Sequence, residues 1–237
     1  MCYNKSEYRN YTRYKMIRAV LFDMDGTVLD TERLMLWGWE QLIREGYLSE
    51  YILEVYPDYC GKTHPEMRRM FFDHYGEDLP LDELYKKRAV HINRRLEEEG
   101  MPLKPGVPEI FEELRKRGYK LALATSTGDS VVARNMELTG YAHYFDAIVT
   151  GSMIQNSKPA PDIFLLAAEK LGVCPEECMV IEDSHAGVRA GVAAGMKVIM
   201  VPDIPRVTDE MRAIAWRICE TLHEVADLVD LASGEAD

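Results

Sequence analysis

Short apolar runs alternate with longer amphipathic stretches along most of this chain. The runs lie at residues 19–22, 120–124, 146–149, 179–181 and 198–201. Buried strands of a parallel sheet appear as continuous apolar runs, because helices cover both faces of such a sheet. The stretches between the later runs are long enough for the crossover helices of βαβ units. The pattern therefore predicts an α/β fold with a Rossmann-like parallel sheet as its core.

A helical block without any strand pattern separates the first two runs, over residues 31–100. Within it, Ser49 can cap a short helix that ends before Pro57, and residues 63–66 form a capping box that opens another helix. A long charged helix ends at Gly100, a residue typical of C-caps. We expect this block to be a small α-helical cap domain that closes over the strand ends and excludes water.

The insertion divides the predicted catalytic core into residues 16–30 and 101–237. Residues 1–15 have no apolar segment typical of a secretory signal, and we expect them to be a poorly ordered N-terminal extension. No apolar run approaches the length of a membrane span. The five cysteines are scattered and lack zinc-site spacing, which favours free thiols in a reducing cytoplasm.

The net charge of −12 argues against nucleic acid as a partner, since that binding depends on phosphate neutralisation by Lys and Arg. An acidic protein that binds an anion must do so locally, with a metal, a lysine or backbone N–H groups. We expect a monomer that acts on a small molecule, with no membrane partner.

Polar side chains follow four of the predicted strands. Because the carboxyl ends of parallel strands meet at one edge of a sheet, we expect these side chains to converge. Two carboxylates two residues apart repel each other unless a cation or a shared proton intervenes. The set therefore predicts metal-assisted chemistry on an anionic substrate. It comprises Asp23, Asp25, Thr125, Ser126, Lys158, Glu182 and Asp183.

Phosphoryl transfer fits this set of residues. Asp23 would attack phosphorus and form an aspartyl-phosphate. Asp25 would protonate the leaving oxygen and later deprotonate water. Lys158 and the Thr125 hydroxyl would hold the phosphoryl oxygens as charge spreads over them, helped by backbone N–H groups around Ser126.

Magnesium is the metal that suits such a site, because it takes oxygen ligands from one or two carboxylates, water and substrate phosphate. The side chains of Asp23 and Asp183 and the backbone carbonyl of Asp25 are the expected Mg²⁺ ligands.

These segments resemble the four motifs of the haloacid dehalogenase superfamily, and residues 157–164 and 182–187 resemble its β-phosphoglucomutase-like branch. The resemblance spans residues 19–202. It implies a Rossmann-like core, a helical cap between the first two motifs, Mg²⁺ and an aspartyl-phosphate intermediate. It also implies that Glu182 lies beside the metal-binding Asp183 and acts on the metal directly or through water.

The second aspartate, Asp25, argues against the metal-free dehalogenases of the superfamily. A mutase of the family has a histidine on the first cap helix and an arginine on a cap loop, where this chain has Met35 and His64. These departures favour a phosphatase of a small phosphorylated metabolite, with a sugar phosphate as the expected substrate. Lys62 and His64 are candidate substrate contacts from the cap. A β-phosphoglucomutase-type mutase and a non-catalytic module that binds a phosphorylated ligand are the alternatives.

Overall fold

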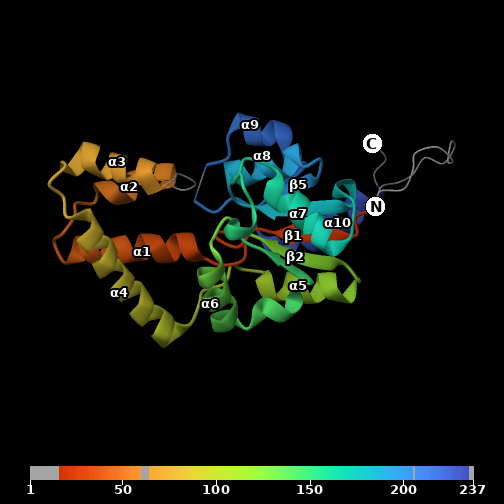
Figure 1. The fold of residues 1–237 in the computed structure, drawn as a ribbon, viewed down its shortest axis with the longest axis horizontal. Coiled ribbons are helices and arrows are strands. Elements are labelled where there is room, and N and C mark those ends of the chain that lie inside the picture. The colour runs from red at the N-terminus through yellow and green to blue at the C-terminus, as the bar shows by residue number, and fades with distance from the viewer. Residues whose placement is uncertain (1–15, 60–63, 205, 235–237) are drawn as a thin grey trace.

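The computed structural model describes residues 16–59, 64–204 and 206–234. The core is a six-stranded sheet in the order β3-β2-β1-β4-β5-β6, and every neighbouring pair is parallel (Figure 1). The predicted α/β fold is confirmed. The strands are β1 (Ala19–Phe22), β2 (Lys120–Ala124), β3 (Ala147–Val149), β4 (Cys178–Glu182), β5 (Lys197–Met200) and β6 (Arg217–Ile218).

Helices cover both faces of this sheet, which explains why the strands are continuous apolar runs. Phe22 of β1 packs with α5 (Val107–Lys116), α6 (Asp129–Thr139) and α10 (Val225–Gly234) on one face. Leu21, the next residue back along β1, packs on the opposite face. The helices of that face are α7 (Asp162–Leu171), α8 (His185–Ala193) and α9 (Asp209–Ile214). Short 3₁₀ helices lie at Tyr141–Tyr144, Gly151–Met153, Pro175–Glu177 and Leu222–Glu224.

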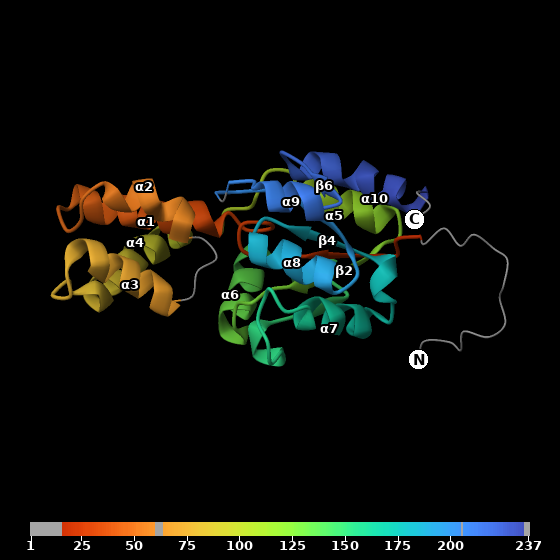
Figure 2. The ribbon, with the colours of Figure 1, turned by 90° about the horizontal axis from the view of Figure 1, so that it is seen from above.

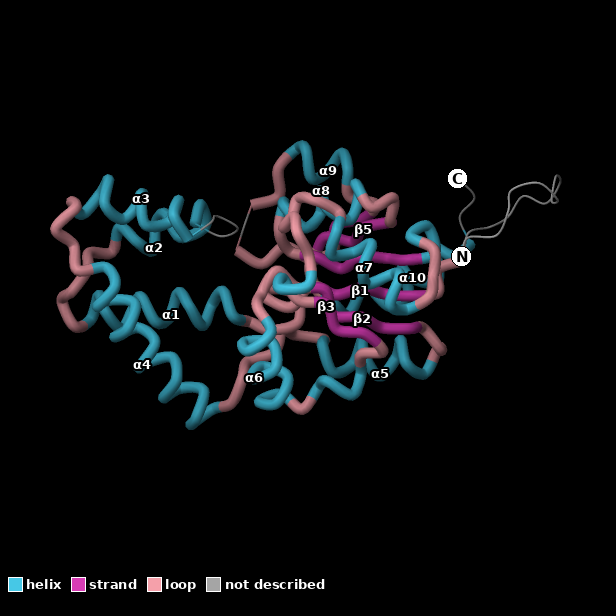
Figure 3. Tube along the Cα trace, viewed as in Figure 1, coloured by secondary structure: helices cyan, strands magenta, loops and turns pink. Residues whose placement is uncertain are grey.

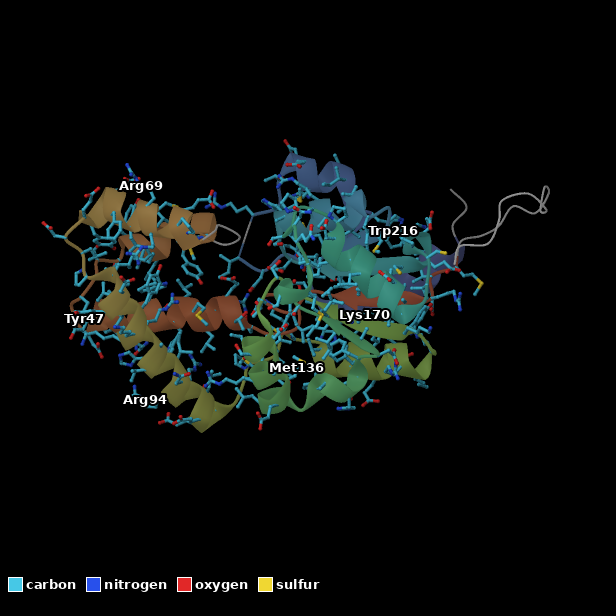
Figure 4. All side chains as sticks on the ribbon, in the orientation of Figure 1. Tyr47, Arg69, Arg94, Met136, Lys170 and Trp216 are labelled. Carbon is cyan, nitrogen blue, oxygen red and sulfur yellow. The ribbon has the colours of Figure 1, made fainter. Side chains whose placement is uncertain are left out.

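The segment between β1 and α5 forms a separate group of helices, here called the helical insert. It consists of α1 (Thr31–Arg44), α2 (Tyr51–Tyr59), α3 (His64–Tyr75) and α4 (Leu81–Glu99), which lie to one side of the sheet beyond its carboxyl ends (Figures 1, 2 and 3). Tyr47, Arg69 and Arg94 mark the insert among the side chains (Figure 4). Its own apolar cluster is built around Trp39, Leu42, Ile52, Phe71, Leu81 and Leu84.

One predicted helix end is wrong. The helix that was expected to end before Pro57 is α2, which contains Pro57 and runs to Tyr59. Pro57 lies in the last turn of this nine-residue helix, where its missing N–H removes a single helical hydrogen bond. None of the helices in the described part of the chain is long and apolar enough to cross a membrane.

Two chain segments join the insert to the core, and they are paired with each other. Leu29 and Leu103 form an antiparallel bridge. The Asp30 N–H donates to the Pro102 carbonyl at 2.9 Å, and the Lys104 N–H donates to the Val28 carbonyl at 3.0 Å. The insert is therefore attached to the core through a short two-stranded connection next to β1.

Candidate active site

The predicted site residues meet at the carboxyl edge of the sheet, because β1 lies between β2 and β4. Asp23 directly follows β1, Thr125 directly follows β2, and Asp183 directly follows β4. Asp23, Thr125 and Asp183 are all buried, although each is polar. Buried polar groups need partners of opposite charge or hydrogen bonds, so the contacts of these side chains define the site.

Lys158 connects three strand ends. Its ammonium group donates to Asp23 Oδ1, to Glu182 Oε1 at 2.8 Å and to the Ala124 carbonyl at 3.1 Å. Only 6% of the Lys158 side chain is exposed. Lys158, which the sequence predicts in a loop, thus lies buried between two carboxylates at the carboxyl edge of the sheet.

Glu182 is fixed through both of its carboxylate oxygens. Oε1 accepts from Lys158, while Oε2 accepts from the Ser184 N–H at 2.8 Å and the Ser184 hydroxyl at 2.9 Å. The space beside it exists only because residue 187 is glycine, since a Cβ on Gly187 would lie 1.6 Å from Glu182 Oε1. Glu182 is therefore engaged by Lys158 and Ser184 and has a fixed orientation.

Asp183 sits against the turn that follows β1. Thr27 donates its hydroxyl to Asp183 Oδ1 at 3.1 Å. Gly26 has φ +82°, and a Cβ there would lie 2.4 Å from Asp183 Oδ2. A glycine is thus required at position 26 both for the left-handed backbone and for the close approach of this carboxylate.

The buried carboxylates have abnormal acidities. Burial, together with the nearby charges of Glu182 and Asp25, raises the pKa of Asp23 to about 7, although Lys158 acts in the opposite direction. Burial and the charges of Glu182 and Asp23 also raise the pKa of Asp183 well above its usual value. The edge of the sheet therefore carries more negative charge than Lys158 alone can balance.

These observations fit a divalent cation that prefers oxygen. Within the described residues, no three His, Cys, Asp or Glu side chains form a ready-made metal cluster. Asp23 and Asp183 are instead a pair of buried carboxylates with raised pKa values, and Asp183 lies close to the backbone of Gly26. Magnesium sites commonly use one or two carboxylates and leave the other positions to water and phosphate.

Asp25 has partners distinct from those of Asp23. Its Oδ1 accepts the Thr31 hydroxyl at 2.9 Å and its Oδ2 accepts the Thr127 hydroxyl at 2.6 Å. Asp25 is only half-buried, whereas Asp23 is buried. The two carboxylates that the sequence places two residues apart therefore occupy different environments, which is the usual basis for different chemical roles.

The remaining residues that the sequence analysis singled out have fewer contacts with the site or lie outside the described residues. Ser126 is exposed, and its backbone carbonyl passes so close to Gly151 that a Cβ there would lie 2.1 Å from the oxygen. Lys62 lies outside the described residues, and His64 is described only as the first residue of α3. Met35, at the position of the mutase histidine, is partly buried among apolar residues of the insert.

Sequence reasoning missed the hydroxyl groups that orient the carboxylates. Thr27, Thr31 and Thr127 each donate to an aspartate of the site, and Ser184 donates to Glu182. A signal was present, because each of these residues lies within six positions of one of the site's carboxylates or strand-end hydroxyls along the chain.

The sequence predicts Thr31 and Ser184 as helix caps. Ser184 does cap α8, where its hydroxyl accepts from the Gly187 N–H at 3.0 Å. The prediction for Thr31 is wrong, because Asp30 is the N-cap of α1 and the Thr31 hydroxyl donates to Asp25.

The fold and this edge define a class of Rossmann-like α/β proteins in which a helical insert follows the first strand and acidic residues and a lysine lie at the carboxyl edge of the sheet. The chain belongs to the haloacid dehalogenase-like hydrolase family, whose model matches residues 20–201. The predicted superfamily is thus confirmed, as is the prediction of an enzyme of the phosphoric monoester hydrolase class.

Three similar proteins illustrate the family. A Drosophila melanogaster protein named "Probable pseudouridine-5'-phosphatase" is 36% identical over 217 residues, covering 88% of this chain and 92% of that protein. The phosphorylated carbohydrates phosphatase of Thermotoga maritima is 34% identical, covering 76% of this chain and 83% of its own. A β-phosphoglucomutase-like structure from Thermotoga maritima has a TM-score of 0.74 and 29% identity, covering 90% of this chain and 98% of that chain.

Proposed function

We propose that this chain is a Mg²⁺-dependent phosphatase that hydrolyses a small phosphorylated metabolite, with a sugar phosphate as the favoured substrate class. The observation that carries the proposal is the buried Lys158, which binds Asp23 at the edge where Thr125 and Asp183 also converge. Similarity to phosphatases of phosphorylated carbohydrates and of a nucleotide supports the same reaction class.

In this proposal Asp23 attacks phosphorus, and the bond from phosphorus to the leaving oxygen breaks. Asp25 gives its proton to that oxygen, so the product leaves as an alcohol. Lys158 and the Thr125 hydroxyl hold the phosphoryl oxygens throughout. Water then attacks the aspartyl-phosphate while Asp25 accepts its proton, which releases phosphate and restores the Asp23 carboxylate.

Magnesium would be held by the side chains of Asp23 and Asp183 and by the backbone carbonyl of Asp25. When bound, it supplies positive charge that offsets the negative charge on the phosphoryl oxygens. Thr27 orients Asp183 for this role through its hydrogen bond to Oδ1. Glu182 acts mainly by holding Lys158, since both of its oxygens already accept hydrogen bonds.

The helical insert would close over the bound substrate and determine which metabolite fits. Lys62 and His64 remain proposed contacts from the insert to the substrate. Hydrolysis is favoured over a mutase reaction because Met35, which replaces the mutase histidine, packs among apolar side chains of the insert.

The test is a panel of phosphorylated metabolites in which phosphate release and isomerisation are both measured. It should include sugar phosphates, pseudouridine 5'-phosphate and β-glucose 1-phosphate. We expect phosphate release, and we expect Asp23→Asn to lower turnover by on the order of 1,000-fold or more. Asp78→Asn, which changes an exposed aspartate of the insert, is the matched control and should retain activity.

Three outcomes would contradict the proposal. Full activity of Asp23→Asn would show that Asp23 is not the nucleophile. Conversion of β-glucose 1-phosphate to glucose 6-phosphate without phosphate release would establish a mutase. Thermal stabilisation by phosphorylated ligands without any turnover would indicate a binding module. Chelation by EDTA should abolish activity and added Mg²⁺ should restore it.

A further inference from the structure

The orientation of the helical insert is set by few contacts with the core. Its helices pack on one another, above all α1 on α4 and α2, and none has an extended contact with a helix or strand of the core in the described part of the chain. Asn93 on α4 accepts a hydrogen bond from the exposed Arg134 on α6 at 3.0 Å. Ile204, in the loop after β5, packs against the insert's apolar cluster.

A group of four charged residues lies where the insert joins the core, here called the linker cluster: Asp30, Arg33, Lys104 and Asp203. Lys104 donates to Asp203 Oδ1 at 2.6 Å, and its ammonium is 3.7 Å from Asp30 Oδ1. Arg33 lies 3.4 Å from Asp203 Oδ1. Asp203, from the loop after β5, thus contacts the second connection through Lys104 and the first helix of the insert through Arg33.

The linker cluster is unusually buried for a set of ion pairs. The Asp203 side chain is 0% exposed and the Lys104 side chain 10% exposed. Asp203 Oδ2 and Asp30 Oδ1 are buried and accept no hydrogen bond within the described residues. A buried ion pair contributes little net stability, because desolvation offsets the attraction, and carboxylate oxygens that accept no hydrogen bond make it less favourable still. Stability alone therefore does not account for this arrangement.

The cluster is also connected to the active site through the backbone. The Val201 N–H, two residues before Asp203, donates to the Glu182 carbonyl at 2.7 Å. The Lys104 N–H donates to Val28, whose own N–H donates to Met24 at 2.9 Å. These backbone hydrogen bonds hold Asp203 and Lys104 on the core beside the catalytic edge, so the pair can serve as a fixed reference for the insert.

We propose that Asp203 is a positioning residue, which fixes the orientation of the helical insert relative to the strand ends through Lys104 and Arg33. Two carboxylates share one ammonium, and the distances from Lys104 Nζ to Asp203 and to Asp30 differ by only about 1 Å, 2.6 against 3.7 Å. Lys104 exchanges between the two aspartates as the insert rotates about its connections. Asp203 thereby affects the binding of substrates that are large enough to contact the insert. The chemical step at Asp23 stays unchanged.

This inference rests on the proposed phosphatase function, and the experiment separates the two. The variants Asp203→Asn and Lys104→Met are compared with the wild type on two substrates. One is acetyl phosphate, which is too small to need the insert, and the other is the best sugar phosphate from the panel. We expect the KM for the sugar phosphate to rise about tenfold, equivalent to about 1.4 kcal/mol, with acetyl phosphate hydrolysis within about twofold of wild type.

Glu210→Gln is the matched control. It removes an exposed ion pair between Arg189 of α8 and Glu210 of α9, and it should leave the KM for both substrates unchanged.

A second readout does not depend on catalysis. Spin labels at Val90→Cys on α4 and Val192→Cys on α8, both exposed positions, report the distance from insert to core in a background with Cys2, Cys60 and Cys174 replaced by Ser. Asp203→Asn should shift or broaden the distance distribution measured by pulsed electron spin resonance.

An unchanged distance distribution together with equal effects on both substrates would overturn the positioning role. Unfolding of both Asp203→Asn and Lys104→Met would also overturn it, because the cluster would then be purely structural. If the wild type releases phosphate from neither substrate, the proposed function fails instead, and the spin-label comparison alone still decides the role of Asp203.

Discussion

Thr31 donates its hydroxyl to Oδ1 of Asp25 at 2.9 Å. Thr31 is the first residue of α1 and so the first residue of the helical insert, whereas Asp25 belongs to the turn after β1. Oδ2 of the same carboxylate accepts from Thr127 of the core. The group to which we assign proton transfer is thus held by the insert on one side and by the core on the other.

Replacement of Thr31 tests this relationship. Thr31→Val keeps the size of the side chain and removes the donor, so Asp25 loses one of its two hydroxyl partners. A hydrogen bond to a charged group contributes about 1.5–3 kcal/mol, and we expect kcat to fall about tenfold. Thr31→Ser retains the hydroxyl and should remain near wild type. Equal kcat values for the two variants would show that Thr31 does not orient Asp25 for catalysis.

Lys158 is expected to matter for stability as well as turnover. Lys158→Met leaves Asp23 and Glu182 buried without their cation, and breaking a buried ion pair typically costs about 3–5 kcal/mol. Urea denaturation in EDTA should show this loss, and phosphate release should be abolished. The control is Lys170→Met at an exposed position of α7 (Figure 4), which should change neither quantity. A Lys158→Met variant that is inactive but as stable as the wild type would show that Lys158 contributes to catalysis and not to stability.

The sheet and the catalytic edge could be predicted from sequence because both depend on local pattern. Apolar runs identify strands, and parallel strands bring residues from Asp23 to Asp183 to one edge regardless of their separation in the chain. Strand β6 was missed, since its two residues, Arg217 and Ile218, form no apolar run. It pairs with β5 only because the fold brings it there.

The linker cluster could not be predicted for a different reason. Lys104 and Asp203 are 99 positions apart, and neither belongs to a recognisable motif. On sequence alone each is an ordinary surface charge, and its burial follows from the way the loop after β5 meets the two connections. Charges that contact one another only through tertiary structure leave no periodic signal.

Stability of the metal-free protein should depend on pH through Asp23. Burial raises the pKa of Asp23 in the folded state from 3.8 to about 7, so protonation of this group favours folding. That stabilisation is complete below pH 3.8 and is lost as the pH rises through about 7. In EDTA, the Tm of the wild type relative to that of Asp23→Asn should therefore fall between pH 5 and pH 8.

Magnesium should reverse this loss at pH 8, because it offsets the charge of the ionised carboxylates and binds only the folded state. Differential scanning calorimetry at both pH values, with EDTA or with Mg²⁺, measures the effect. A Tm difference between wild type and Asp23→Asn that does not change with pH would show that Asp23 is ionised throughout this range.

The glycine beside Asp183 provides a test of the metal site that leaves every carboxylate in place. Gly26→Ala introduces a Cβ 2.4 Å from Asp183 Oδ2 at a residue with φ +82°, so the carboxylate must move. Gly118→Ala is the control, because Gly118 has φ +85° and open space around the added Cβ. Both variants incur backbone strain of about 1–2 kcal/mol, which should lower the Tm of each, and the displacement of Asp183 should lower the Tm of Gly26→Ala further. Only Gly26→Ala should also raise the Mg²⁺ concentration needed for half-maximal phosphate release. If the two variants require the same Mg²⁺ concentration as the wild type, Asp183 is not a metal ligand.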